Sequence, residues 1–472
     1  MERKNFDLTV IGAGPGGYVA AIKASQAGLN VCLIEKGPLG GTCLNVGCIP
    51  TKTLLANATV MQKIVHAAEY GITTGPVTFD YAKMKSRKDS VLDKIRKSLE
   101  GLLQSNGIVI LRGHAEFLSP KEIKVKGQDN VIIHTEKTII ATGSEPLDIA
   151  AFPCDHEKIF NSTSILELTT LPKTLSIVGG GYIGCEFASL FADLGVKVII
   201  LEALPSIVML QGKAVSEALT RAFVKKGIEI HTGVMVEGID HLATGLSVRL
   251  KDKPSISCDL ALISIGRKIV SSNLGLEKAG VAVSDKGMIT VDEKMQTNVP
   301  GIYAIGDVTG KYMLAHVASH QGIIAAANAI GQSAQMHYNA VPAVIFTNPE
   351  IATVGLTLEQ AQEAGYTAGL GKFPFQALGK SIAAMETEGF AQVIIDRKSG
   401  QILGAQVVGH EASTLIAEMA LAIANELTLD CVMDTIHAHP TVAEAWAEAA
   451  LIANETPIHF PPKIKNDLRR RA

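Results

Sequence analysis

Short apolar runs, a glycine-rich turn and a helical stretch follow one another near the start of the chain. Residues 8–11 are apolar and lead into the turn Gly-Ala-Gly-Pro-Gly-Gly at residues 12–17. A helical stretch then reaches a second apolar run at residues 31–34, which ends at Glu35. Apolar runs of this length bounded by glycine predict buried strands, so the segment is expected to fold as strand, turn, helix and strand.

The same order recurs near residue 180. Residues 175–178 are apolar, the turn at 179–184 reads Gly-Gly-Gly-Tyr-Ile-Gly, and a second apolar run at 196–201 ends at Glu202. In both copies a further glycine stands 16 residues after the first glycine of the turn, and a glutamate stands 23 residues after it. One GxGxxG turn is weak evidence, but two copies with matching offsets favour two dinucleotide-binding units.

Each turn carries residue types that suit a pyrophosphate. The first glycine allows the tight turn, the second lets backbone N–H groups approach the phosphates, and the third lets the helix pack on the strand. The helix N-terminus attracts negative charge, and the glutamate can accept hydrogen bonds from a ribose. The candidate residues are Gly12, Gly14, Gly17 and Glu35 in the first copy, and Gly179, Gly181, Gly184 and Glu202 in the second.

Glu202 also bears on the choice of nicotinamide. A 2′-phosphate would be repelled by this carboxylate, and NADP sites usually place an arginine nearby. Residues 203–210 contain no lysine or arginine. We therefore expect the second site to prefer NAD to NADP. Two dinucleotide sites in one chain suggest a flavin dinucleotide in the first and a nicotinamide dinucleotide in the second.

Composition and charge exclude several classes of protein. The chain has 472 residues, with 43 basic and 46 acidic side chains and a net charge of −3. This balance argues against a protein that coats nucleic acid or anionic membranes. Apolar residues make up 47% and charged residues 19% of the chain, which is a globular composition with length for about three domains. The stretch 322–349 has no Asp, Glu, Lys or Arg, but it contains Asn, Gln, His and Pro and indicates buried structure rather than a membrane span.

The seven cysteines are irregularly spaced and do not form the framework of a small secreted protein. The first residues, Met-Glu-Arg-Lys-Asn-Phe-Asp, fit no apolar signal segment. We therefore expect a soluble protein of a reducing compartment, most simply the cytoplasm.

Cys43 and Cys48 stand close together shortly after the first dinucleotide unit. In a regular helix their Cα atoms would be about 8.6 Å apart, whereas a disulfide needs less than about 7 Å. A bond between them therefore requires an irregular helix, and Gly47 can absorb the distortion. Two unrelated buried thiols, or half a zinc site, are the alternatives. No second ligand pair with zinc-like spacing is found, so no metal site is expected.

The segment at residues 40–52, Gly-Gly-Thr-Cys-Leu-Asn-Val-Gly-Cys-Ile-Pro-Thr-Lys, resembles the redox-active segment of the flavoprotein disulfide reductases, most closely that of the dihydrolipoyl dehydrogenases. Further motifs of this family follow in order over essentially the whole chain. They are Ala141-Thr142-Gly143-Ser144 at the crossover out of the flavin domain, Gly179 to Glu186 at the NAD turn, Ile265-Gly266-Arg267 at the exit from that domain, Ile302-Tyr303-Ala304-Ile305-Gly306-Asp307 at the second flavin motif, and His437-Ala438-His439-Pro440-Thr441 with Glu444 at the C-terminal catalytic motif.

The resemblance implies a role for each matched residue. Cys43 would be the interchange thiol that meets the substrate, and Cys48 the thiol nearest the flavin. Lys52 would lie near the flavin ring and pair with Glu186. His439 would be the acid–base group, supplied by the partner subunit of a homodimer and oriented by Glu444. The other residues implied at the cofactors are Ala115, Thr142, Gly143, Asp307, Met313, Leu314, Ala315, His316, Val234 and Gly266.

These roles agree with the chemistry. Thiol–disulfide exchange needs a thiolate, and histidine is the side chain that accepts a proton near neutral pH. Glu444, five residues beyond His439, can fix the tautomer of the ring as the acid of a triad does. Pro440 keeps His439 out of a helical conformation, which suits a catalytic group in a loop. Without the surrounding motif, His439 would be interpreted as a histidine of the core. We interpret His437 as structural.

We therefore expect an α/β protein with two doubly wound, Rossmann-like dinucleotide domains and a C-terminal α+β dimerisation domain. The expected domains are 1–147 for FAD, 148–270 for NAD, 271–343 as a central domain that completes the FAD site, and 344–472 for dimerisation. The activity implied by the resemblance is oxidation of dihydrolipoyl groups with NAD. These groups would be carried on the E2 component of a 2-oxoacid dehydrogenase complex or on the glycine-cleavage carrier protein. No nucleic-acid or membrane partner is expected.

Other members of the family are alternatives. A glutathione or trypanothione reductase shares the cysteine pair but uses NADP, which Glu202 disfavours. A mercuric reductase would need a C-terminal cysteine pair, and the last cysteine is Cys431. A transhydrogenase of this fold would not need the cysteine pair. A scaffold or binding protein that has lost its activity would not be expected to keep both cysteines together with Lys52, Glu186, His439 and Glu444.

Departures from the family pattern at residues 206–211, 268–270 and 317–321 leave open the nicotinamide affinity and the parent complex. The tail at 463–472, with three consecutive arginines, is expected to be a solvated end.

Overall fold

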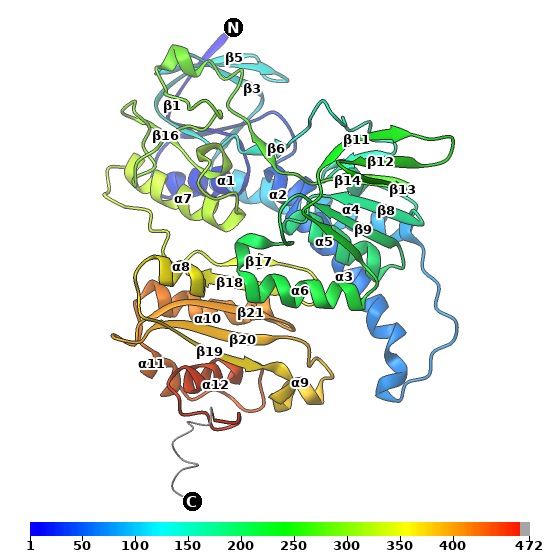
Figure 1. Cartoon of the computed structure of the whole chain (residues 1–472). Coiled ribbons are helices and arrows are strands. Elements are labelled where there is room, and N and C mark those ends of the chain that lie inside the picture. Colours follow the sequence, from blue (N-terminus) through cyan, green and yellow to red (C-terminus); the bar gives the residue numbers. More distant parts are fainter. Residues whose placement is uncertain (463–472) are drawn as a thin grey trace, which may run out of the picture. The chain divides into compact units, whose positions relative to one another are not determined.

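The computed structural model of the protein describes residues 1–462, which form two compact units (Figure 1). Unit 1 comprises Met1–Pro172 and Leu262–His337, and unit 2 comprises Lys173–Ala261 and the described residues 338–462. The division into four domains stays a prediction. The basic tail at 463–472 lies outside the described residues.

The sheet of unit 1 is centred on the strand predicted at residues 8–11. That strand is the end of β1, which pairs in parallel with β2 on one side and with β5 on the other. The parallel strands lie in the order β3 (Val109–Ser119), β2 (Val31–Glu35), β1 (Glu2–Ile11), β5 (Val131–Ile140) and β16 (Ile302–Ala304). β4 (Glu122–Gly127) joins β3 to β5 by antiparallel pairing. A parallel sheet with its first strand in the interior is typical of doubly wound folds.

Two helices of unit 1, α1 (Pro15–Gln26) and α7 (Ala315–Ala329), pack against each other through small residues (Figure 1). A Cβ atom on Gly16 would lie 2.8 Å from the carbonyl oxygen of Ala318, and one on Gly322 would lie 2.5 Å from the carbonyl oxygen of Gly16. Side chains at these glycines would therefore push the helices apart. The other helices of this unit are α2 (Gly41–Val46), α3 (Cys48–Val65) and α4 (Tyr81–Ser105). Its short strands are β6 (Ser144–Pro146), β7 (Ile159–Asn161) and β15 (Arg267–Ile269).

Unit 2 begins with the second copy of the repeat. The parallel strands β10 (Glu229–Thr232), β9 (Lys197–Glu202) and β8 (Thr174–Val178) lie side by side, with β14 (Leu260–Ile263) next to β8. The helices are α5 (Tyr182–Asp193) and α6 (Lys213–Lys225). An antiparallel meander of β11 (Val236–His241), β12 (Leu246–Leu250) and β13 (Lys253–Cys258) completes this part of the unit.

The C-terminal part of unit 2 is an antiparallel sheet with helices packed on it (Figure 1). Its strands, in sheet order, are β17 (Ala343–Ile345), β18 (Ile351–Gly355), β21 (Ile402–Val408), β20 (Phe390–Asp396) and β19 (Ala368–Pro374). The helices are α8 (Leu358–Glu363), α9 (Gly379–Ala383), α10 (Ala412–Ala424), α11 (Leu429–Met433) and α12 (Glu444–Ala453).

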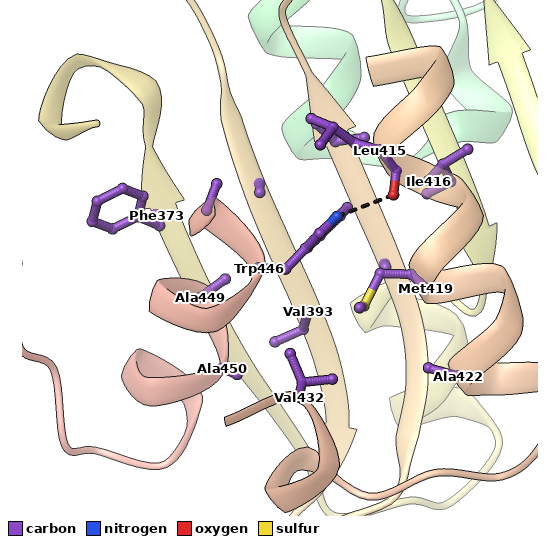
Figure 2. Close-up of a cluster of buried hydrophobic side chains, with 14 of the residues drawn as sticks. Phe373, Val393, Leu415, Ile416, Met419, Ala422, Val432, Trp446, Ala449 and Ala450 are labelled. Atoms are coloured by element: carbon purple, nitrogen blue, oxygen red, sulfur yellow. Dashed lines mark hydrogen bonds between the residues drawn. The ribbon is translucent and has the colours of Figure 1, made fainter. Parts of the chain in front are cut away.

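Trp446, the only tryptophan of the chain, lies at the centre of the C-terminal core and is fully buried. Figure 2 shows its indole ring reaching from α12 toward α10, with Met419 and Val432 nearby. The indole Nε1 donates a hydrogen bond of 3.1 Å to the carbonyl oxygen of Leu415. Because the ring satisfies its polar group while it fills the core, it fixes α12 relative to α10.

The predicted fold class is confirmed. Both repeats form strand, turn, helix and strand, and the C-terminal part is an antiparallel sheet with helices. Among the described residues, no helix is both long and apolar enough to cross a membrane.

Candidate active site

The first glycine turn has the geometry that a dinucleotide site requires. Gly12 has φ of +103°, and a Cβ atom there would lie 2.4 Å from the carbonyl oxygen of Ala141, so only glycine fits. Gly14 is the N-cap of α1, and Pro15 follows at the first helical position. A Cβ atom on the third glycine, Gly17, would lie 1.9 Å from the carbonyl oxygen of Gly12. The helix can therefore pack this closely on the turn only with glycine at this position.

The second turn repeats this geometry. Gly179 has φ of +105°, its N–H donates to the carbonyl oxygen of Leu201 at 2.8 Å, and Gly181 is the N-cap of α5. Gly184, the third glycine of the turn, is buried within α5. A Cβ atom on Gly181 would meet nothing within 4 Å, so the space at this helix N-terminus is open to a ligand.

The two glutamates hold their turns in the same way. Glu35 accepts hydrogen bonds from the N–H groups of Ala13 and Gly37, at 2.8 and 2.7 Å. Glu202 accepts them from the N–H groups of Gly180 and Leu204, at 2.6 and 2.7 Å. Each carboxylate oxygen takes one of these bonds and keeps capacity for another, which suits a ribose hydroxyl.

Cys43 and Cys48 lie on two consecutive helices that are interrupted between them. α2 ends at Val46, α3 begins at Cys48, and Gly47 between them has φ of −140° and ψ of −109°. The irregularity expected at Gly47 is therefore found. A side-chain hydrogen bond joins the two cysteines.

This cysteine segment is fixed directly to the first glycine turn. The N–H of Gly40 donates to the carbonyl oxygen of Ala13 at 2.9 Å. A Cβ atom on Gly41 would lie 2.6 Å from the Cα atom of Gly14, so the two backbones touch. Asn45 braces the start of α2 through its amide, which donates to the carbonyl oxygen of Gly41 at 2.8 Å. The thiols are thereby held beside the turn that would bind the first dinucleotide.

The electrostatics of the pair separate its two thiols. The hydrogen bond with Cys48, followed by burial and by the charge of Cys48, raises the pKa of Cys43, while the Lys52 ammonium lowers it. Cys48 is the first residue of α3, where the positive end of the helix dipole favours a thiolate. The negative charge of Cys48 thus disfavours a second thiolate at Cys43.

Asp307 lies in a cluster that joins three of the predicted motifs. The Ser144 hydroxyl donates to Asp307 Oδ2, and Arg267 Nε donates to the same hydroxyl oxygen at 2.7 Å. Arg267 also donates from Nη2 to the carbonyl oxygen of Ser144 at 2.8 Å. Gly306, before Asp307, donates its N–H to the buried amide of Gln321 at 2.6 Å. The sequence analysis named Arg267 and Ser144 only as parts of motifs, and Gln321 only within the segment 317–321 that departs from the family pattern.

The remaining residues expected near the first cofactor lie in unit 1. Met313 and Leu314 precede α7, and Ala315 and His316 form its first turn, with Leu314 as the N-cap. The hydroxyl of Thr142 donates to the carbonyl oxygen of Val270, whose N–H donates to Gly143. Ala115 is buried on β3. Gly266, expected at the nicotinamide, also lies in unit 1, with φ of +132°.

A loop after Glu202 packs against the second glycine turn. The sequence analysis did not predict that this loop forms part of the site. Val208 has φ of +42°, which a branched side chain rarely adopts, and its N–H donates to the carbonyl oxygen of Gly180 at 2.9 Å. A Cβ atom on Gly180 would lie 2.8 Å from Ile207 Cγ2. The buried Val234 donates its N–H to the carbonyl oxygen of Glu202 at 3.0 Å. The segment 206–211, which departs from the family pattern, thus packs apolar residues against the turn.

Gln211 ties the end of this loop to the C-terminal sheet. Its side-chain oxygen accepts from the hydroxyl of Thr353 at 2.6 Å, and its carbonyl oxygen accepts from Gln406 Nε2 at 2.7 Å. Gln406 in turn accepts from the buried Gln392. These hydrogen bonds between glutamine side chains therefore fix the loop to the C-terminal sheet.

His439 and Glu444 form a dyad within unit 2. The Nδ1 atom of His439 lies 2.8 Å from Glu444 Oε1, and Glu444 Oε2 accepts from the N–H of Thr441 at 2.9 Å. The His439 side chain is 77% exposed, so its Nε2 edge can reach a substrate. Burial tends to raise the pKa of Glu444, but the hydrogen bonds from His439 and Thr441 and the charges of His439 and His437 lower it overall.

Glu186 and Lys52 lie in different units. Glu186 is buried on α5, where its Oε1 accepts from the N–H of Phe346 at 2.9 Å. Lys52 lies on α3, four residues after Cys48. Their pairing stays a prediction. Within residues 1–462, no group of three or more His, Cys, Asp or Glu side chains is arranged to hold a metal ion.

Comparison with known proteins assigns the family. Residues 6–322 match the model of the pyridine nucleotide-disulphide oxidoreductases. The chain belongs to this family. Residues 341–450 match the family's dimerisation domain, which supports a homodimer. The resemblance found in the motifs is therefore confirmed, and the enzyme is an oxidoreductase that uses FAD and NAD(H).

Its relatives include enzymes named dihydrolipoyl dehydrogenase. The one from Chlamydia pneumoniae is 51% identical over 460 residues, which cover 98% of this chain and 99% of that protein. The one from Bacillus subtilis is 41% identical over 459 residues, covering 96% and 97%. Among solved structures, LpdA from Mycobacterium tuberculosis matches with a TM-score of 0.89 and 26% identity, covering 95% of this chain and 99% of that one. The HOCl-induced flavoprotein disulfide reductase RclA from Escherichia coli matches with 0.84 and 30%, covering 93% and 98%.

The residues of this oxidoreductase fit both cofactors. Gly12, Gly14 and Glu35 would hold FAD in the first turn, with Asp307 available to its ribityl–phosphate region. Gly179, Gly181 and Glu202 would hold NAD in the second. The open space at Gly181 and the spare acceptor capacity of the two carboxylates are the observations that support this fit.

Proposed function

We propose that the protein is a dihydrolipoyl dehydrogenase, which oxidises dihydrolipoyl groups on a carrier protein and passes their electrons to NAD⁺. The observation that carries the proposal is the hydrogen-bonded Cys43–Cys48 pair fixed to the FAD turn. The names of its relatives and the Glu202 site support the choice of substrates.

The residues of the protein itself would carry out the proton transfer and the thiol–disulfide exchange. His439 of the partner subunit would take a proton from the dihydrolipoyl dithiol, and the resulting thiolate would attack the Cys43 sulfur of a Cys43–Cys48 disulfide. The mixed disulfide would then resolve when the second substrate thiolate attacks the substrate sulfur, releasing oxidised lipoyl and leaving Cys43 and Cys48 reduced. When bound, FAD supplies the two-electron relay between this dithiol and NAD⁺.

The His439–Glu444 contact supports this division of labour. A carboxylate on Nδ1 fixes the proton at that nitrogen and leaves Nε2 as the base. The carboxylate also stabilises the imidazolium that forms when Nε2 takes the proton.

The proposal extends to partner and compartment. The carrier would be the lipoyl-bearing E2 component of a 2-oxoacid dehydrogenase complex, or the glycine-cleavage carrier protein. We place the enzyme in the cytoplasm because its seven cysteines are irregularly spaced and do not form the disulfide framework of a small secreted protein.

Anaerobic titration of the FAD-bound enzyme with dihydrolipoamide tests the proposal. One equivalent should produce a long-wavelength absorbance band from a thiolate beside the flavin, and Cys48→Ser should abolish that band. No reaction with dihydrolipoamide, together with rapid reduction by NADPH and reoxidation by glutathione disulfide, would favour a glutathione-type reductase instead.

A further inference from the structure

His437 makes two contacts that a neutral histidine ring cannot satisfy together. Its Nδ1 atom lies 3.0 Å from the carbonyl oxygen of Thr435, and its Nε2 atom lies 2.9 Å from Glu418 Oε1 on α10. A carbonyl oxygen and an ionised carboxylate are both acceptors, and a neutral imidazole has one N–H. One of the two contacts would then be a repulsion between lone pairs.

A doubly protonated ring satisfies both contacts, and its surroundings favour this form. The His437 side chain is only 7% exposed, so solvent does not replace either partner. The ionisable groups that act on it are Glu418 from α10 and Glu444 from α12, and both carry negative charge when ionised.

We propose that His437 is a positioning residue that is protonated at neutral pH, and that its imidazolium ties the loop carrying His439 to α10 and keeps Glu444 ionised. This inference rests on the proposed function, because it assigns His437 a part in preparing the acid–base group of that reaction. The hydrogen bond with Glu418, with the charges of Glu418 and Glu444, raises the pKa of His437.

The two histidines of the loop thus divide their roles through different surroundings. The side chain of His439 is mostly exposed and has an acceptor on Nδ1, which leaves its Nε2 edge open to a substrate. The side chain of His437 is little exposed, lies between two acceptors and holds both protons at neutral pH. The hydrogen bond from the buried Trp446 to Leu415 joins α12, which begins with Glu444, to α10, which carries Glu418.

The first test reads the protonation of His437 without any turnover. The full-length, FAD-bound dimer would be labelled with ¹⁵N-histidine, and the ring signals of His437 would be assigned by their loss in His437→Gln. Both ring nitrogens should stay at imidazolium shifts from pH 6 to pH 8. One nitrogen at the shift of an unprotonated imidazole at pH 7 would overturn the proposal, whether or not the enzyme oxidises dihydrolipoamide.

The second test separates positioning from a merely structural role. In His437→Gln, Glu444 and His439 lose a neighbouring cation, so the acidic limb of the kcat/KM profile for dihydrolipoamide should move up by about half a pH unit. Glu418→Gln, which removes the carboxylate that holds the proton of His437, should move the same limb in the same direction and no further than His437→Gln does, and it should add nothing in the His437→Gln background.

The control is His134→Gln, which breaks an exposed His–Glu contact of 3.5 Å on β5. It should leave the profile unchanged. A His437→Gln enzyme that loses the same factor of activity at every pH, with both limbs in place, would show that the residue only supports the loop.

Discussion

The Nδ1 atom of His439 lies 2.8 Å from Glu444 Oε1, and the other oxygen of that carboxylate is held by the N–H of Thr441. The carboxylate is therefore fixed at both oxygens before it orients the ring. Such fixation matters because an acid–base group contributes fully only when its tautomer and direction are set in advance.

Glu444→Gln should lower kcat for dihydrolipoamide on the order of 10²-fold, because the amide neither holds the tautomer as firmly nor stabilises the imidazolium. Reduction of an artificial dye by NADH does not need the histidine and should stay near the wild-type rate. Steady-state kinetics of both reactions give the comparison. Glu136→Gln, on the exposed face of β5, is the control, and equal loss in both reactions would point to misfolding rather than to acid–base chemistry.

Cys43→Ser should abolish dihydrolipoamide oxidation while dye reduction by NADH persists, since the flavin and nicotinamide steps bypass the dithiol. Cys48→Ser should do the same. Cys431→Ser removes an exposed cysteine and should change neither rate. Dihydrolipoamide activity that survives Cys43→Ser would move the chemistry off this pair.

Glu202 and Glu35 provide a matched pair, since each takes two backbone N–H groups in the same manner. Glu202→Ala should reduce the preference for NAD⁺ over NADP⁺ by roughly tenfold, equivalent to about 1.4 kcal/mol. Glu35→Ala should lower the FAD retained per chain after dialysis without changing that preference. Ratios of kcat/KM and flavin absorbance would measure the two effects, and an unchanged preference in Glu202→Ala would contradict the assignment of the second site to NAD.

The Glu418–His437 contact should stabilise the fold in a pH-dependent way. Because the pKa of His437 is raised above its usual value of 6.5 in the folded protein, the contribution is fully present below about pH 6.5. It is lost as the pH rises through the raised value. Denaturant unfolding should therefore show a larger loss of stability in Glu418→Gln at pH 6 than at pH 9. A loss that is the same at both pH values would indicate that no proton is linked to this contact.

Trp446→Ala should destabilise the C-terminal part by about 3–5 kcal/mol, because it empties a fully buried site. Trp446→Phe should cost less, chiefly the hydrogen bond to Leu415, about 1 kcal/mol. Unfolding followed by circular dichroism measures both. Equal stability of the three proteins would show that the ring does not anchor α12 to α10.

Features set by neighbouring residues could be predicted from the sequence. The two repeats, the helix interruption at Gly47 and the His439–Glu444 contact all depend on short spacings and on the backbone freedom of glycine. The Arg267–Ser144–Asp307 cluster and the Gln211–Gln406 contact could not, because they join residues 123 to 195 positions apart. No periodicity encodes which distant loops meet. The pattern also could not show that both ring nitrogens of His437 face acceptors.

The central claim is tested most directly by the steady-state rates of the purified enzyme with three substrate pairs. These are dihydrolipoamide with NAD⁺, dihydrolipoamide with NADP⁺, and glutathione disulfide with NADPH, each repeated with Cys43→Ser and His439→Ala. We expect strong activity only with the first pair, and loss of that activity in both variants. Activity with glutathione disulfide and NADPH instead would contradict both the dihydrolipoyl assignment and the interpretation of Glu202.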